Sequence, residues 1–76
     1  MYHIKAIWDN EARVWVAESE EVPGLVAEAA SLDGLKAKLD ILIPELLEAN
    51  GRIPAGRKSV EIPIQLMAEY QELVRS

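Results

Sequence analysis

The sequence has 76 residues and a formal net charge of −5, from 13 acidic and 8 basic side chains. It contains no cysteine and one histidine, which excludes disulfides, thiolate metal sites and clusters of histidine ligands. A chain of this length is expected to form one small domain, and its negative charge favours basic protein partners over nucleic acid. Because no stretch approaches the ~20 apolar residues of a membrane span, we expect a soluble cytoplasmic protein without membrane contact.

Two runs near the start have the composition of paired strands. Residues 2–8 alternate in character, and residues 13–17 are rich in Val and Trp, with a turn at 9–11 between them. This pattern predicts an antiparallel hairpin. If about five residues connect the strands, one face of the hairpin collects Tyr2, Ile4, Ala6, Trp8, Val14 and Val16, and the other collects Ile7, Trp15 and Ala17. We expect the first face to meet a helix.

The longest predicted element is a helix over residues 31–51. An acidic connection at 18–21 and a type II turn with Pro23 and Gly24 lead into a third strand at 25–30, which precedes the helix. Leucines recur in the helix at intervals of three and four, which produces one broad apolar face that must be buried. Ser31 is a suitable N-cap, and Pro44 predicts a bend inside the helix.

The remaining residues predict a fourth strand and a second helix. Residues 59–64 alternate in polarity and include Pro63, which is typical of an edge strand. Apolar residues between positions 66 and 74 have helical spacing, which predicts a short amphipathic helix. We therefore expect a single α+β domain over 1–76, with an antiparallel sheet in the order strand, strand, strand, helix, strand, and a short C-terminal helix. Residues 1–55 are expected to form the core, and residues 57–76, with the C-terminal strand and helix, are a candidate dimerisation segment.

Several of these motifs occur together in a known family. The strand Val14-Trp15-Val16-Ala17, the acidic link, the turn Val22-Pro23-Gly24-Leu25 and the segment Ala30-Ser31-Leu32 are followed by a leucine-rich helix that ends before Asn50-Gly51. Residues 1–55 thereby resemble the HicB-like antitoxin domain, in particular its short stand-alone subfamily. The resemblance implies a partial double-stranded-RNA-binding type of fold. It also implies that the chain neutralises a small, basic, RNA-cleaving toxin of the HicA type by binding it.

The predicted partner-binding residues combine apolar and acidic side chains. Ile7 and Trp15 lie on the sheet face away from the predicted helix, where an antiparallel sheet is normally polar. Either a partner or the C-terminal helix of the same chain covers them. Three acidic residues of the link, Glu18, Glu20 and Glu21, would face a basic toxin. Their alternative roles are a divalent-cation site or simple solvation of a loop, and the latter is the better supported because no EF-hand spacing is present.

No catalytic, metal or cofactor site is predicted. His3 has no Ser or Cys nucleophile placed beside it by any motif, so we expect no enzymatic activity. Self-association is predicted through the apolar residues of the C-terminal segment, which are Val60, Ile62, Ile64, Leu66, Met67, Tyr70 and Leu73. Two alternatives to the antitoxin function remain. One is a structural or regulatory homo-oligomer of two or a higher even number of copies; the other is an autorepressor that binds DNA through the C-terminal strand and helix, although we expect weak or absent DNA binding.

Overall fold

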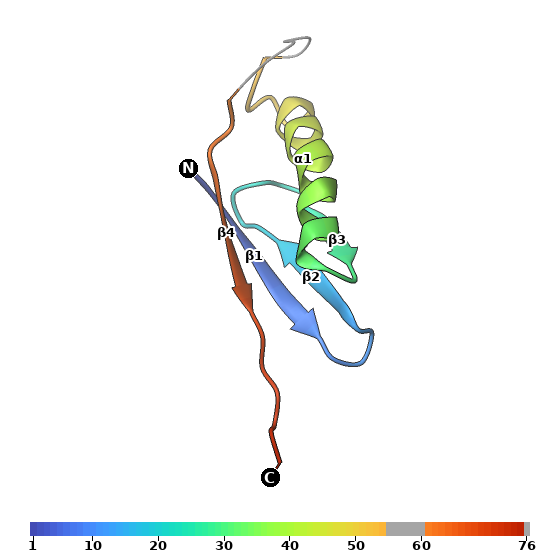
Figure 1. Ribbon diagram of the computed structural model, residues 1–76. Coiled ribbons are helices and arrows are strands. Elements are labelled where there is room, and N and C mark those ends of the chain that lie inside the picture. Colours follow the sequence, from blue (N-terminus) through green and yellow to red (C-terminus); the bar gives the residue numbers. More distant parts are fainter. Residues whose placement is uncertain (55–60, 76) are drawn as a thin grey trace.

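The computed structural model describes residues 1–54 and 61–75 and has one helix packed on a four-stranded sheet (Figure 1). The elements are β1 (Tyr2–Asp9), β2 (Val14–Glu18), β3 (Val26–Ala29), α1 (Leu32–Ala49) and β4 (Ile64–Glu69). The predicted α+β class is therefore confirmed. Residues 55–60, which include the start of the predicted fourth strand and of the predicted dimerisation segment, lie outside the described residues.

The sheet is mixed, which corrects the prediction of an antiparallel sheet. Its strand order is β3-β2-β1-β4. The β1–β2 and β2–β3 pairs are antiparallel, whereas β1 and β4 are parallel. The reason is the crossover through α1. The helix carries the chain back along the sheet, so the strand that follows it enters from the same end as β1 and β3.

The faces of the first hairpin also differ from the prediction. Asp9 pairs with Val14 and Trp8 pairs with Trp15, so four residues rather than five connect the strands. The Asp9 carboxylate accepts hydrogen bonds from two main-chain N–H groups of the turn, and Arg13 takes a positive φ of 59°. Because side chains alternate along a strand, this shift of one residue turns all of β2 over. Trp15 and Ala17 now face the helix, while Val14 and Val16 lie on the outer face with Ile7.

The predicted C-terminal helix is a strand and an extended arm. β4 begins at Ile64, later than the predicted strand, and pairs with β1 as far as Glu69; residues 70–75 continue without regular structure. A helix of about ten residues is marginal without tertiary support. Pairing with β1 instead satisfies the main-chain groups on the inner side of β4, and Ile64 and Leu66 are apolar at the alternating spacing that a strand requires.

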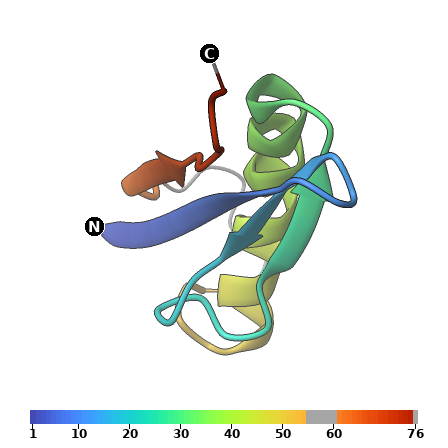
Figure 2. The ribbon, with the colours of Figure 1, turned by 90° about the horizontal axis from the view of Figure 1, so that it is seen from below.

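The predicted helix is present as α1, and its N-terminus is capped as expected. The Ser31 hydroxyl accepts a hydrogen bond from the Gly34 N–H at 3.0 Å. Figure 2 shows α1 lying along one face of the sheet, and it packs mainly against β3 and β2. The buried core comprises Ile4, Ala6, Ala17, Val22, Leu25, Ala27, Leu35, Leu39, Ile43 and Leu47. Alanines at three of the sheet positions allow the helix to approach closely. One face of the sheet is thus covered by α1, and the other is open.

Candidate protein-binding face

The open face of the sheet carries an apolar side chain on each of its four strands. Ile7 of β1 pairs with Val16 of β2, and both point away from α1. Met67 of β4 is 60% exposed and Val26 of β3 is 76% exposed on the same face. An antiparallel sheet with one solvated face normally has polar residues there. Exposed apolar side chains at these positions are typical of a surface that contacts another molecule.

A broad groove of about 920 Å³ crosses one end of this face. Its walls are the acidic link at residues 18–21 and the last part of β4, and its floor contains His3 and Lys5 of β1. Four of the lining residues are acidic, namely Glu18, Glu20, Glu21 and Glu69. Because Lys5 is the one lysine or arginine among the residues that line the groove, the groove has a negative potential that favours a cationic partner.

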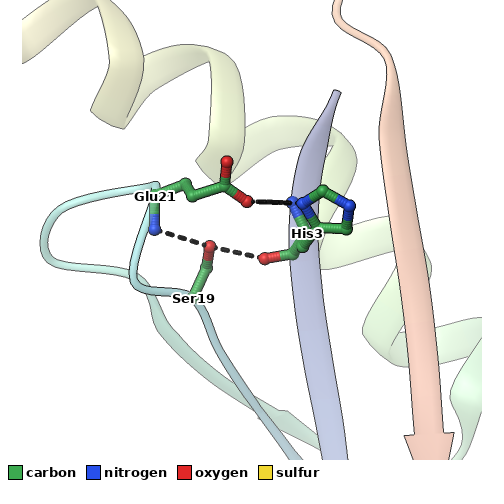
Figure 3. A network of polar contacts seen from close by, with 3 residues as sticks. All are labelled: His3, Ser19 and Glu21. Atoms are coloured by element: carbon green, nitrogen blue, oxygen red, sulfur yellow. Dashed lines mark hydrogen bonds and ion pairs between the residues drawn. The ribbon is translucent and has the colours of Figure 1, made fainter.

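The acidic link is held against β1 by a network of His3, Ser19 and Glu21 (Figure 3). The Glu21 carboxylate accepts a hydrogen bond from the His3 main-chain N–H at 2.7 Å and lies 2.8 Å from the imidazole Nδ1. The Ser19 hydroxyl donates to the His3 carbonyl at 2.7 Å and accepts from the Glu21 N–H at 3.1 Å. The hydrogen bond from the His3 main chain, and after it the one from the ring, lowers the pKa of Glu21.

This network contains the residue types of a hydrolase triad but has a different geometry. A nucleophilic serine must donate its proton to the imidazole of the histidine. Here the Ser19 hydroxyl bonds to main-chain atoms, and the histidine ring contacts the carboxylate instead. The arrangement therefore fixes the conformation of the link. Among residues 1–54 and 61–75, no group of three or more His, Cys, Asp or Glu side chains is placed to hold a metal ion.

The structure brings together four of the five residues predicted to bind a partner. Ile7 and Glu18 lie on the open face, and Glu20 and Glu21 line the groove at its edge. Trp15 does not join them. It packs on the opposite face, against the core, because the hairpin connection is one residue shorter than predicted.

Trp15 belongs to an aromatic cluster at the far end of β1. Its ring centroid lies 5.4 Å from that of Trp8 and 6.1 Å from that of Tyr70, and the Arg13 guanidinium lies 5.4 Å from the Trp8 ring. These distances are favourable for aromatic and cation–π contacts. The cluster attaches the start of the extended arm to the sheet, so the direction of the arm is fixed at its root.

The residues predicted to mediate self-association are divided between two faces. Ile62, Ile64 and Leu66 are half-buried and pack against the core on the helix side. Met67 is on the open face, and Leu73 in the arm is 91% exposed. Tyr70 contacts the tryptophans, as described above, and Val60 lies outside the described residues.

Three residues of this region were not predicted from the sequence. Ser19 is a generic loop residue, and its contact with His3 spans 16 positions, for which no local pattern exists. Val16 and Val26 were assigned to no partner surface, because the outer face depends on the hairpin register. The local signal for the shorter connection is Asp9, whose carboxylate accepts a hydrogen bond from the Glu11 N–H two residues later, as in an Asx turn.

Comparisons with known proteins place this chain in a family. The model of a family described as "Domain of unknown function (DUF1902)" matches residues 1–75. The chain belongs to the DUF1902 family. A solved structure similar to this DUF1902 protein is that of the hypothetical protein TTHA1013 from the extremely thermophilic bacterium Thermus thermophilus. The two chains share 46% sequence identity over 97% of this chain and 96% of the other, with a TM-score of 0.68. No curated protein matches this chain. Within the described part of this DUF1902 protein, no helix has the length and apolar character needed to cross a bilayer.

Proposed function

We propose that this protein is a non-catalytic, cytoplasmic binding domain that occludes a basic protein through its open sheet face, in the manner of a HicB-like antitoxin with a partial double-stranded-RNA-binding fold. The observation that carries the proposal is the combination of apolar side chains exposed on that face with an acidic groove at one end of it. Interfaces commonly join a desolvated apolar centre to a charged rim of complementary sign.

The partner class follows from this chemistry. A ribonuclease toxin must bind the RNA phosphate backbone, so its functional surface is basic. A carboxylate-lined groove provides a complementary potential, and Ile7 and Met67 provide the apolar contact that makes the complex more than an electrostatic encounter. The antitoxin function also rests on the sequence motifs of residues 14–51 that resemble HicB-like domains.

The alternative of a DNA-binding autorepressor has less support. It requires a helix after the fourth strand to enter a groove of DNA. Residues 64–69 form a strand and residues 70–75 are extended, and no second helix is present in the ranges 1–54 and 61–75.

A binding and inhibition assay with a purified, small, basic HicA-type ribonuclease tests the proposal. The wild-type protein is expected to bind the toxin and to stop its cleavage of RNA. The double variant Glu18→Lys/Glu69→Lys places two positive charges in the groove and should weaken binding at least about tenfold, or about 1.4 kcal/mol. The matched control Glu45→Lys/Glu48→Lys makes the same change in net charge on exposed positions of α1 and should bind within about twofold of wild type.

Two results would contradict the proposal. Equal weakening by both double variants would show that net charge acts without this groove. Absence of binding to HicA-type toxins, with uninhibited RNA cleavage, would remove the antitoxin function.

A further inference from the structure

The outer edge of β4 presents unpaired main-chain groups. β4 is the last strand in the sheet order, with β1 on its other side. The Tyr2 N–H donates to the Pro63 carbonyl at 2.9 Å, which fixes the phase of the parallel ladder. Because successive residues of a strand direct their main-chain groups to opposite sides, positions 65, 67 and 69 bond toward β1. The N–H and C=O groups of Ile64, Leu66 and Ala68 therefore point outward.

The centre of this edge lacks the features that normally protect an edge strand. Natural edges carry lysine, proline or a bulge, or they are very short. Pro63 precedes β4 and Glu69 ends it, but residues 64–68 between them have the sequence Ile-Gln-Leu-Met-Ala, without a charge or a proline. The opposite edge, β3, has only four residues and carries Glu28 between two alanines. β4 therefore offers the longer uncharged stretch of edge.

The chain is more extended than a compact domain. The accessible surface is 5708 Å², whereas a compact monomer of this mass exposes about 4,700 Å². The radius of gyration is 14.1 Å, compared with roughly 11 Å for a compact domain of this length.

The extended arm contributes to this excess. Figure 1 shows the chain continuing past the end of β1 after β4. Leu73 is 91% exposed and Val74 is 84% exposed there, so the apolar side chains of the arm make little contact with their own sheet. Tyr70 holds the root of the arm against Trp8 and Trp15. The arm is directed away from its own domain.

We propose that two copies of this chain pair through β4, antiparallel about a two-fold axis at Met67, to form one continuous sheet. In this register the outward main-chain groups of Leu66 face those of Ala68 of the partner subunit, as an antiparallel ladder requires. Gln65 lies opposite Glu69 of the partner subunit, where the amide donates to the carboxylate, and the two Glu69 side chains are kept apart. Each arm then begins beside residues 61–63 of the partner subunit.

A second copy is the occupant that this edge fits, because the strand is complementary to itself in a two-fold arrangement. The proposal goes beyond the function proposed above and does not depend on what the groove binds. The competing hypothesis is that a strand from another protein occupies this edge. In that case the purified chain alone would be a monomer, whereas pairing of two copies makes it a dimer.

Disulfide trapping tests the register directly, since the chain has no cysteine of its own. The two Met67 positions would form a non-hydrogen-bonded pair with Cα atoms about 4.5 Å apart, within the range that a disulfide spans. Met67→Cys should therefore form a covalent dimer under mild oxidation. Val26→Cys is a matched control, because this residue is also exposed on the open face but lies on the opposite edge strand; it should remain largely monomeric on a denaturing gel. Equal cross-linking of the two variants would overturn the proposed interface.

A proline substitution tests the edge hydrogen bonds. Ala68→Pro removes an outward N–H and leaves the bonds of β4 to β1 in place. Light scattering at micromolar concentration should give twice the chain mass for wild type and the single chain mass for this variant, with an unchanged circular dichroism spectrum. A monomeric wild-type protein would overturn the proposal, as would a folded Ala68→Pro variant that dimerises as wild type does. If the variant fails to fold, the trapping result decides.

Discussion

Gly24 provides a sharp test of the turn that closes the acidic link. It has a φ of +83°, and the Leu25 N–H donates to the Val22 carbonyl at 3.1 Å across the turn. This is the type II geometry that requires a positive φ at the third position. Val22 and Leu25 on either side of the turn are both buried. The turn therefore connects the groove to the core.

The cost of Gly24→Ala can be assigned to the backbone. A Cβ at this position would lie 3.6 Å from the Leu46 Cδ2 atom, an ordinary van der Waals contact. The expected destabilisation is thus the left-handed penalty alone, about 1–2 kcal/mol. Since a domain of this size has a total stability on the order of 4–11 kcal/mol, the change should be easily measured. It corresponds to a fall in Tm of about 4–16 °C.

Urea or thermal unfolding followed by circular dichroism measures this effect. Gly51→Ala is the matched control, because Gly51 has a φ of +69° and a Cβ there meets no atom within 4 Å. The two variants should lose the same stability within about 0.5 kcal/mol. Gly24→Asn should lose less than Gly24→Ala, because asparagine tolerates the left-handed region better. A Gly24→Ala protein as stable as wild type, with Gly51→Ala destabilised, would refute the turn geometry.

Two further predictions concern the helix face and the acidic link. Leu39 is fully buried in α1, so Leu39→Ala should lower the free energy of unfolding by about 2–5 kcal/mol. Ile41 lies on the same helix and is 63% exposed, so Ile41→Ala should change this free energy by less than about 0.5 kcal/mol. Equal losses in the two variants would contradict the orientation of the helix. Because hydrogen bonds from His3 lower the pKa of Glu21 in the folded state, the carboxylate stabilises the fold above its ordinary pKa and loses this contribution as the pH falls through the lowered value. The difference in unfolding free energy between wild type and Glu21→Gln should therefore be constant near neutral pH and shrink on acidification below about pH 4.5; a difference that grows with acid would show the opposite sign of the shift.

The sequence determined those features that depend on neighbouring residues. The leucine spacing and Ser31 specify α1 and its start, since amphipathic burial and N-capping are local effects. Val22 to Leu25 specify their turn for the same reason, because only glycine adopts the required φ without strain. The acidic link and Ile7 were recognised as candidates for a binding surface because unusual composition is visible without a fold.

Only the tertiary structure decided which side chains share a face and what the C-terminal segment becomes. One residue in the connection between β1 and β2 moved Trp15 from the open face to the core, since a strand has a period of two. The residues after Pro63 fit both a helix and a strand, and the free edge of β1 selected the strand by supplying hydrogen-bond partners that an isolated helix of this length cannot match. The contact of Ser19 with His3 likewise exists only because the sheet brings distant positions together.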